Sequence, residues 1–162
     1  MHSVVILQSL VLLILANGTP IVAKKILGGR FSRSLDGGLK FIDRRPLFGS
    51  AKTIRGILVS ILITAAGAPL VGVQPKVGAL VVITAMVGDL FSSFVKRRLN
   101  FRPSSQALGL DQVPESLLPL LACRDRLSLT VADIALAVLI FFVCELILSR
   151  ILYKAHLRDE PY

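Results

Sequence analysis

An aspartate inside an apolar segment is the first residue expected to carry chemistry. Residues 88–98 read Gly-Asp-Leu-Phe-Ser-Ser-Phe-Val-Lys-Arg-Arg, so an acid precedes a cationic cluster. At helical spacing one face would carry Asp89, Ser92, Ser93, Lys96 and Arg97. A carboxylate at that depth is costly unless it is paired, hydrated or bound to a metal, so Asp89 predicts a functional site. The alternative is that Asp89 only pairs with Lys96 or with another helix.

A second carboxylate returns to the boundary of the apolar segments at Asp111, within Leu108-Gly109-Leu110-Asp111-Gln112. Asp89 and Asp111 could share a divalent cation. Magnesium takes oxygen ligands and usually holds one or two protein carboxylates, completing its shell with water and substrate phosphates. The alternative for Asp111 is a helix cap, because an apolar stretch follows it.

A third cluster, Lys52-Thr53-Ile54-Arg55-Gly56, ends a polar loop where an apolar segment begins. Glycine permits close backbone approach to a ligand, lysine supplies a point charge, and arginine supplies a planar fork for phosphate oxygens. The alternative is that these cations only anchor a helix end against lipid headgroups. Glu145, inside the last apolar segment, either pairs with a cation on a neighbouring helix or lines the site.

The composition indicates a membrane protein. Of 162 residues, 54% are hydrophobic and the mean hydropathy is +0.73, too apolar for one soluble core. The net charge of +9 would suggest nucleic acid in a soluble protein, but here we ascribe it to topology and phosphate ligands and expect no nucleic-acid partner. Because the only histidines, His2 and His156, lie near the termini, any chemistry must use carboxylates, cations, hydroxyls or a metal.

The elements that must position these residues are apolar helices in a single domain, residues 1–162. We expect an all-α polytopic membrane protein with about five transmembrane helices and two polar cytoplasmic loops. The expected spans are Ser3–Ala23, Ile57–Val73, Val77–Val95, the short Val113–Cys123, and Leu129–Leu152. With the N-terminus outside and the C-terminus inside, most of the 19 Lys and Arg residues are cytoplasmic. The number of Lys and Arg residues on the cytoplasmic side hardly changes if Val113–Cys123 only dips into the membrane, so charge does not separate the two topologies.

The three motifs, in order, resemble those of the CDP-alcohol-forming membrane cytidylyltransferases, and most closely the archaeal CDP-archaeol synthases. Residues 88–98 are similar to the family's Gly-Asp...Ser-Phe-x-Lys-Arg-Arg element, Lys52 to Gly56 resembles its Lys-Thr-x-Arg/Glu-Gly element, and Leu110-Asp111-Gln112 resembles its Leu-Asp-Gln/Arg element. The resemblance covers nearly the whole chain. A compact five-span plan matches the archaeal branch, since the bacterial and eukaryotic relatives carry extra N-terminal helices. It favours five spans and an archaeol lipid.

This resemblance implies transfer of CMP from CTP to an isoprenoid glycerophosphate lipid, 2,3-bis-O-geranylgeranylglyceryl phosphate, with the active site on the cytoplasmic side of the cell membrane. Asp89 and Asp111 would bind Mg2+, and Lys96 would join them in catalysis. Phosphate groups would be bound by Lys52, Thr53, Arg55, Ser93, Arg97 and Arg98. One departure is Pro114, because the family commonly has a second acid at that position; here Glu115 follows one step later.

Other readings predict different behaviour. A CDP-diacylglycerol synthase would use phosphatidic acid instead of the ether lipid. A small membrane transporter would line a polar pathway with Asp89 and Glu145. A scaffold would use its basic loops to bind anionic lipid, but it leaves the intramembrane Asp89 unexplained. The oligomeric state is left open.

Overall fold

The computed structural model describes residues 2–102 and 105–154, and within these ranges the chain is helical, with two isolated β-bridges and no longer strand. The elements are α1 (Ser3–Leu27), α2 (Ile54–Gly67), the short 3-10 helix η1 (Ala68–Val71), α3 (Pro75–Arg98), α4 (Gln112–Ala122) and α5 (Val131–Lys154). The expectation of an all-α membrane protein is therefore confirmed. The tail beyond Lys154, expected to be cytoplasmic, lies outside the described residues.

Four helical segments are long and apolar enough to cross a membrane: α1, α2 continued by η1, α3 and α5. Each corresponds to an expected span, with boundaries shifted by a few residues. Helix α4 is the expected fifth segment, but it has only 11 residues, whereas a full crossing needs about 20. That α4 spans the bilayer stays a prediction.

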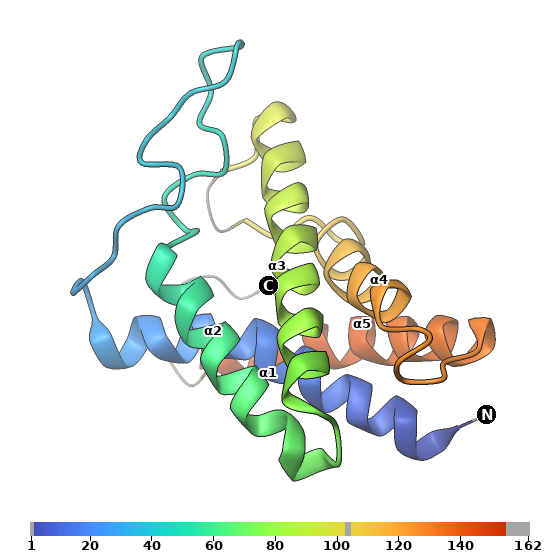
Figure 1. The fold of residues 1–162 in the computed structure, drawn as a ribbon. Helices are drawn as coiled ribbons and strands as arrows, with labels where there is room; N and C mark the ends of the chain where they lie inside the picture. Colours follow the sequence, from blue (N-terminus) through green and yellow to red (C-terminus); the bar gives the residue numbers. More distant parts are fainter. Residues whose placement is uncertain (1, 103–104, 155–162) are drawn as a thin grey trace.

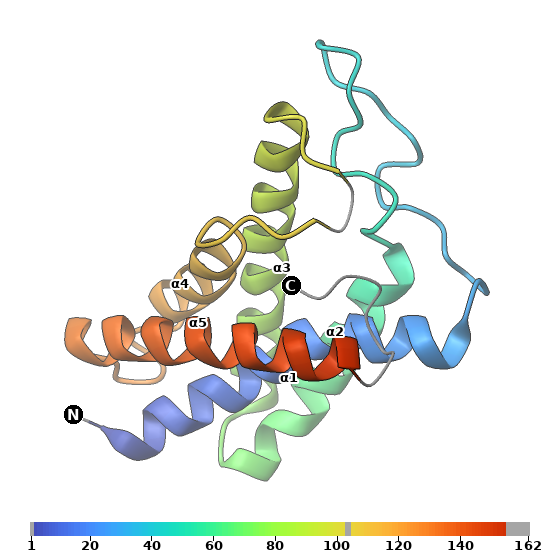
Figure 2. The same cartoon turned by 180° about the vertical axis from the view of Figure 1, so that it is seen from behind.

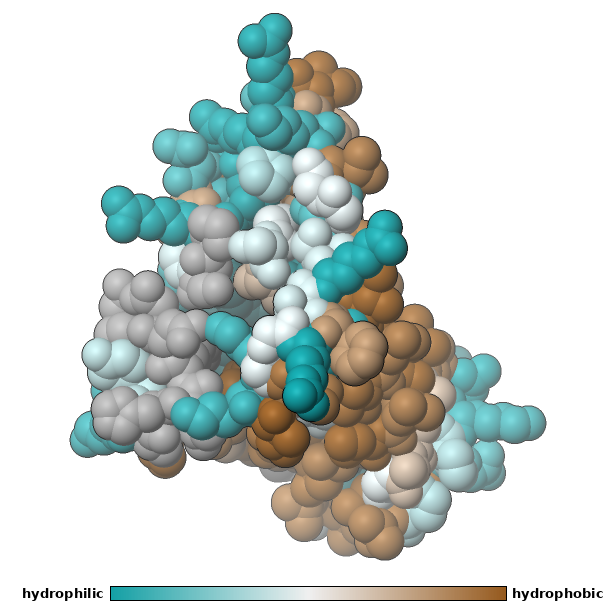
Figure 3. Space-filling view, turned by 90° about the vertical axis from the view of Figure 1, so that its left-hand side faces the viewer, coloured by the Kyte–Doolittle hydropathy of each residue, from teal (hydrophilic) through white to brown (hydrophobic). Residues whose placement is uncertain are grey.

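The polar connections gather at one end of the molecule. Figures 1 and 2 show the loop between α1 and α2 beside the C-terminal end of α3, with the α2–α3 turn and the N-terminus toward the opposite end. Helices α1 and α5 lie side by side and run in the same direction, and α3 crosses α1. In Figure 3 hydrophilic side chains gather at the top, over the polar loop, and hydrophobic ones lie below. This polarity is the one expected if both long loops face the same aqueous side.

Small residues and hydroxyls allow the helices to approach closely. The Ser60 hydroxyl on α2 donates to the carbonyl oxygen of Ala16 on α1. A Cβ added at Gly78 would lie 2.6 Å from the Cβ of Ala68. Helices in membranes associate through such close packing and interhelical hydrogen bonds, because lipid supplies no hydrophobic drive between them.

Candidate active site

The first feature of the site is an ion pair between the first polar loop and α3. Lys52 Nζ lies 2.5 Å from both carboxylate oxygens of Asp89. Both side chains are about three quarters buried, at 24% and 23% exposure. The structure thus brings together two residues that are 37 positions apart. Asp89 is paired, as the alternative to a functional role supposed, but its partner is Lys52 of the first loop and not Lys96 or another helix.

A second ion pair of the same kind joins α3 to the loop before α4. Lys96 Nζ lies 2.6 Å from Asp111 Oδ1, and it also donates to the carbonyl oxygen of Ser105 at 2.9 Å. Asp111 precedes the first residue of α4, yet its side chain caps no amide of that helix. Its other oxygen accepts from the Ala107 amide at 2.8 Å. Asp111 therefore does not act as a simple helix cap, and its carboxylate faces a cation.

The two pairs are neighbours because α3 and α4 cross at a glycine. A Cβ added at Gly88 would lie 2.4 Å from the carbonyl oxygen of Pro114 and 2.8 Å from the Cα of Glu115. One turn further along α3, the Ser92 hydroxyl donates to the carbonyl oxygen of Leu110 at 2.5 Å. These contacts hold the α4 segment, Asp111 included, against the face of α3 that carries the first acid.

Glu115 is the acid that the sequence left undecided, and the crossing places it within the site. Its side chain is buried, and it interacts electrostatically with Asp89, Asp111 and Lys52, as well as with Glu145 on α5. Pro114, which stands where the family commonly has an acid, instead supplies the carbonyl that packs on Gly88. The cluster therefore comprises three carboxylates and two ammonium groups drawn from three segments: Lys52, Asp89, Lys96, Asp111 and Glu115.

Replacing Gly88 with alanine should destabilise the protein by about 1–3 kcal/mol, the usual cost of overpacking a tight contact. The added methyl group meets backbone atoms of α4, which cannot rotate away as a flexible side chain would. Thermal unfolding in detergent, followed by circular dichroism, measures the change.

The matched control is Gly18→Ala in α1, where an added Cβ meets no heavy atom within 4 Å. This variant should unfold at or slightly above the wild-type temperature, because alanine favours helix over glycine. Equal melting temperatures for Gly88→Ala and wild type would contradict the tight crossing.

Asp36, which the sequence reading did not single out, organises the loop that carries Lys52. Its buried carboxylate accepts hydrogen bonds from the amides of Gly38, Phe48 and Gly49 at 2.9–3.0 Å. Burial by itself raises the pKa of Asp36, but these bonds and one from Ser34 outweigh it and hold the pKa below its ordinary value. The loop is therefore tied together by a charged carboxylate. Its sequence signal is an aspartate followed by two glycines.

Two of the expected phosphate ligands serve the fold at the start of α2. The Thr53 hydroxyl caps α2 by accepting from the Gly56 amide at 3.2 Å. The guanidinium of Arg55 is buried and donates to the carbonyl oxygens of Gly28, at 3.0 Å, and Arg30. Thr53 fixes the start of α2 directly after Lys52, and Arg55 ties that start to the chain just after α1, so the structure gives both a positioning role.

Arg98 fastens the tip of the first loop to the end of α3. Its guanidinium lies 2.9 Å from Asp43 and donates to the carbonyl oxygen of Pro46 at 2.6 Å. It also lies over the rings of Phe41 and Phe94, at 5.0 and 4.9 Å from their centroids. Arg98 is thus occupied by loop docking. The remaining expected ligands, Ser93 and Arg97, are buried on the same face of α3 as Lys96.

The carboxylates of the cluster suit Mg2+ when a substrate supplies part of the ion's coordination shell. Among the described residues no three His, Cys, Asp or Glu side chains are arranged as a protein-only metal cage. Asp89 and Asp111 offer carboxylate oxygens that already face a positive charge. Since Mg2+ usually takes one or two protein carboxylates and fills its shell with water and phosphate, these residues fit the ion when a phosphate substrate is present.

The family model and the known proteins that this chain resembles carry the same description. A family model described as CDP-archaeol synthase matches residues 73–162. The chain is 31% identical over 156 residues to the CDP-archaeol synthase of Pyrobaculum calidifontis, covering 91% of this chain and 90% of that protein. The CDP-archaeol synthase of Sulfurisphaera tokodaii is 30% identical over 152 residues, covering 90% and 83%.

One solved structure has the same fold. It is described as an intramembrane enzyme for archaeal membrane lipids biosynthesis, and it matches with a TM-score of 0.64 at 27% identity. The match covers 84% of this chain and 89% of the other. The segment recognised by the family model contains four of the five clustered residues, all except Lys52.

Proposed function

The chain belongs to the CDP-archaeol synthase family, and from this membership we propose that it transfers CMP from CTP to 2,3-bis-O-geranylgeranylglyceryl phosphate. The products are CDP-archaeol and pyrophosphate. The protein is thus a multi-pass membrane cytidylyltransferase of archaeal lipid biosynthesis.

The observation that best supports this chemistry is the pair of Asp–Lys contacts at one site. Lys52 and Lys96 are cations suited to phosphate oxygens, and Asp89 and Asp111 are carboxylates suited to a divalent ion. In this structure each group is balanced by its counterpart within the protein. A substrate with several phosphates and its metal ion could replace both partners at once without leaving an unpaired buried charge.

The reaction needs positioning and charge neutralisation more than proton transfer. An oxygen of the lipid phosphate attacks the α-phosphorus of CTP, a new P–O–P bridge forms, and the bond between the α-phosphorus and the bridging oxygen to the β-phosphorus breaks. The lipid phosphate is already anionic at neutral pH, so no strong base is required. Lys52 and Lys96 hold the phosphates in line and offset their charge. Pyrophosphate leaves with the electron pair of the broken bond.

Asp89 and Asp111 are the residues that would hold Mg2+, with Glu115 beside them. The ion, when bound, supplies positive charge to the triphosphate and helps the leaving pyrophosphate. Arg97 and Ser93 extend the polar face of α3 toward the aqueous end. We place this face on the cytoplasmic side of the cell membrane, because the basic loops beside it follow the positive-inside rule.

A transporter has less support. Asp89, which would line the polar pathway of a transporter, is instead paired with Lys52 at 2.5 Å. The relatives named above are lipid synthases, and they cover nearly the whole chain. Flux through liposomes without consumption of CTP would restore the transporter reading.

The direct test is product formation by detergent-purified protein given CTP and Mg2+. We expect pyrophosphate and a CDP-lipid from geranylgeranylated glyceryl phosphate, little product from diacyl phosphatidic acid, and none when Mg2+ is replaced by a chelator. Product only from the diacyl lipid would assign the CDP-diacylglycerol branch. No product from either lipid would contradict the proposed function.

A further inference from the structure

A wide cavity lies at the end of the molecule opposite the cluster around Asp89. Three segments that are far apart in the sequence form it: the first turns of α1, the turn between α2 and α3, and the turn between α4 and α5. Figures 1 and 2 show these segments together, away from the polar loop beside the C-terminal end of α3. We call this space the outer cavity, and its polar lining residues are Gln8, Gln74, Lys76, Arg126 and Ser128.

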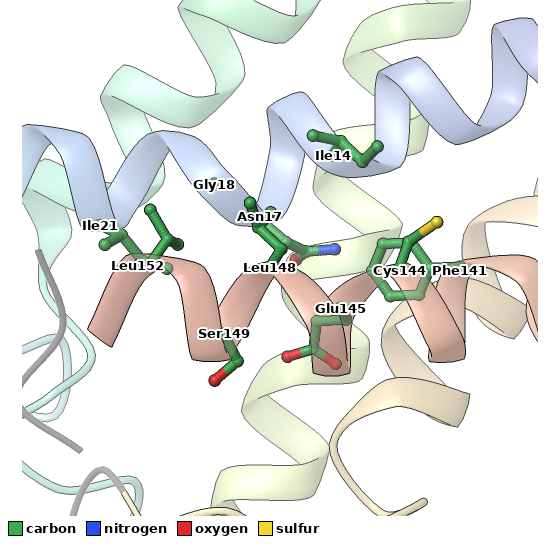
Figure 4. Close-up of a pocket in the computed structure, with 10 residues that line it drawn as sticks. All are labelled: Ile14, Asn17, Gly18, Ile21, Phe141, Cys144, Glu145, Leu148, Ser149 and Leu152. Atoms are coloured by element: carbon green, nitrogen blue, oxygen red, sulfur yellow. The ribbon is translucent and has the colours of Figure 1, made fainter. Parts of the chain in front are cut away.

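The outer cavity is large enough for a lipid headgroup. Its volume is about 640 Å3, within the range of roughly 300–1,000 Å3 that is usual for small-molecule sites. The space between α1 and α5, which Asn17 and Glu145 line, has a volume of about 40 Å3 and holds a few water molecules at most (Figure 4). Of these two spaces, only the outer cavity has room for a ligand.

The wall of the outer cavity carries two cations and no acid. Within the part of the chain that the structure describes, neither Lys76 nor Arg126 forms an ion pair or a hydrogen bond. Lys52 and Lys96, by contrast, are each paired with an aspartate. Asp125 precedes Arg126 in the chain but does not line the cavity. Two cations that lack a counter-charge around one space favour an anionic ligand.

The start of α3 adds to this positive charge. Lys76 stands in the first turn of α3, which contains no acid, and no side chain caps the helix. The aligned peptide dipoles give the N-terminal end of a helix a partial positive charge, so a lysine there is unfavourable unless an anion lies nearby. An anion in the outer cavity would offset the charge of the helix end and of Lys76 together.

Neutral side chains in the same wall can donate hydrogen bonds to phosphate oxygens. The hydroxyl of Ser128 and the amide of Gln74 form no hydrogen bond within the described residues. The amide of Gln8 is already used, because it donates to the carbonyl oxygen of Val71 at 2.7 Å and so ties α1 to the turn before α3. The fold therefore fixes one wall of the outer cavity and leaves donors for a ligand in the others.

The surroundings of the outer cavity favour a lipid over a soluble anion. Its lining also includes Val73, Val77 and Leu127, which are buried apolar residues. Nearby, Leu70 and Val4 are exposed at 89% and 67%, and both belong to segments apolar enough to cross a membrane. A headgroup could bind in the polar part of the cavity while its hydrocarbon chains stay in the surrounding bilayer.

We propose that the outer cavity binds the anionic phosphodiester headgroup of a membrane lipid, in the leaflet opposite the cluster around Asp89, with Lys76 and Arg126 contacting the phosphate. This inference does not rest on the proposed function, because the outer cavity contains none of the residues assigned to catalysis. A lipid bound here contacts all three segments that form the cavity, so it stabilises the folded protein.

Native mass spectrometry of the detergent-purified protein tests the proposal by counting bound lipids. The probes are short-chain phosphatidylglycerol, which is anionic, and short-chain phosphatidylcholine, which is zwitterionic. We expect the wild type to bind one phosphatidylglycerol at least about 10-fold more tightly than phosphatidylcholine. Lys76→Gln and Arg126→Gln should each weaken this binding about 5-fold, and the double variant about 25-fold.

The matched control is Arg124→Gln, which removes the same charge from the same turn as Arg126→Gln. Arg124 does not line the outer cavity, and its side chain donates to the carbonyl oxygen of Leu129. Its variant should bind phosphatidylglycerol as the wild type does. All variants should elute from a sizing column as the wild type does.

A second variant tests the space while both cations stay in place. Gln74→Trp fills the outer cavity, and since the Gln74 side chain does not cap α3, its replacement should not disturb the helix. We expect loss of the tightly bound phosphatidylglycerol. Leu70→Trp adds the same ring at an exposed position outside the cavity and should bind the lipid as the wild type does.

Two results would overturn the proposal. If the double variant binds phosphatidylglycerol as tightly as Arg124→Gln does, the lipid is held elsewhere, the cluster around Asp89 included. If millimolar inorganic phosphate displaces the lipid, the outer cavity takes phosphate from water and is not a lipid site. Both readouts are independent of turnover, so a failure of the proposed function would leave them unchanged.

Discussion

Replacing Asp89 with asparagine is expected to lower kcat by at least about 100-fold if Asp89 holds Mg2+ as proposed. Loss of a residue that only hydrogen-bonds to a metal ligand typically costs about 10–100-fold, and loss of the ligand's own charge should cost more. Asparagine keeps the shape of the side chain but leaves Lys52 without its counter-charge. Pyrophosphate release by purified variant and wild type, at saturating CTP and Mg2+, measures the effect.

The control for this variant is Asp125→Asn, which removes the same charge at an exposed position in the turn between α4 and α5. It should retain wild-type turnover. Both proteins should elute from a sizing column as the wild type does. Near-normal turnover by Asp89→Asn would remove this residue from the metal site and leave its pair with Lys52 as a purely structural contact.

Replacing Asp111 with asparagine should raise the Mg2+ concentration needed for half-maximal activity by about 10-fold or more. The asparagine side-chain oxygen can still accept the hydrogen bond from the Ala107 amide, so the loop before α4 should keep its shape. What is lost is the negative charge that faces Lys96. A titration of initial rate against Mg2+ at fixed CTP gives the measurement.

The matched control is Asp43→Asn in the first loop, because Asp43 also pairs with a cation of α3 but lies at the loop tip. Its Mg2+ dependence should match that of the wild type. If Asp111→Asn shows the same Mg2+ dependence as Asp43→Asn, then Asp111 does not share the ion with Asp89. The ion would then be held by Asp89 alone, or by Glu115 in place of Asp111.

The two ion pairs also bear on how the site stays stable inside a membrane protein. Four charged side chains at this depth would be costly if any were left alone. Pairing each acid with a lysine removes that cost in the absence of substrate. The same pairing means that phosphate and metal must compete with internal partners, so neither is expected to bind tightly without the other. We therefore expect CTP and Mg2+ to bind cooperatively.

Some of the site was readable from the sequence because its signals are local. The spacing of Asp89 and Lys96 along one helix, and the length and apolarity of the four spanning segments, follow from helical periodicity and bilayer thickness alone. Helix existence was therefore predictable, and so was the polar face of α3. The short segment that became α4 was predictable as a helix but not as a crossing, because its 11 residues are only about half of the roughly 20 that a full crossing needs.

The tertiary structure decided which charges meet. Nothing local to Lys52 indicates that it pairs with Asp89, because that contact depends on a loop held by Asp36 and docked by Arg98. Arg55 and Arg98 look like phosphate ligands in the sequence, yet their hydrogen bonds go to loop carbonyls. A cation's type and position in the chain do not say which acceptors the fold will place beside it.

The sequence by itself thus determined the class of protein, the membrane helices and the two acids at the boundary, since hydropathy and residue type are properties of each segment. Only the tertiary structure paired Lys52 with Asp89 and brought Glu115 to the cluster, through the close crossing of α3 and α4 at Gly88. The physical reason is that both features depend on how separate segments pack against each other, which hydropathy and residue type do not specify. The side chain absent at Gly88 matters there as much as those present.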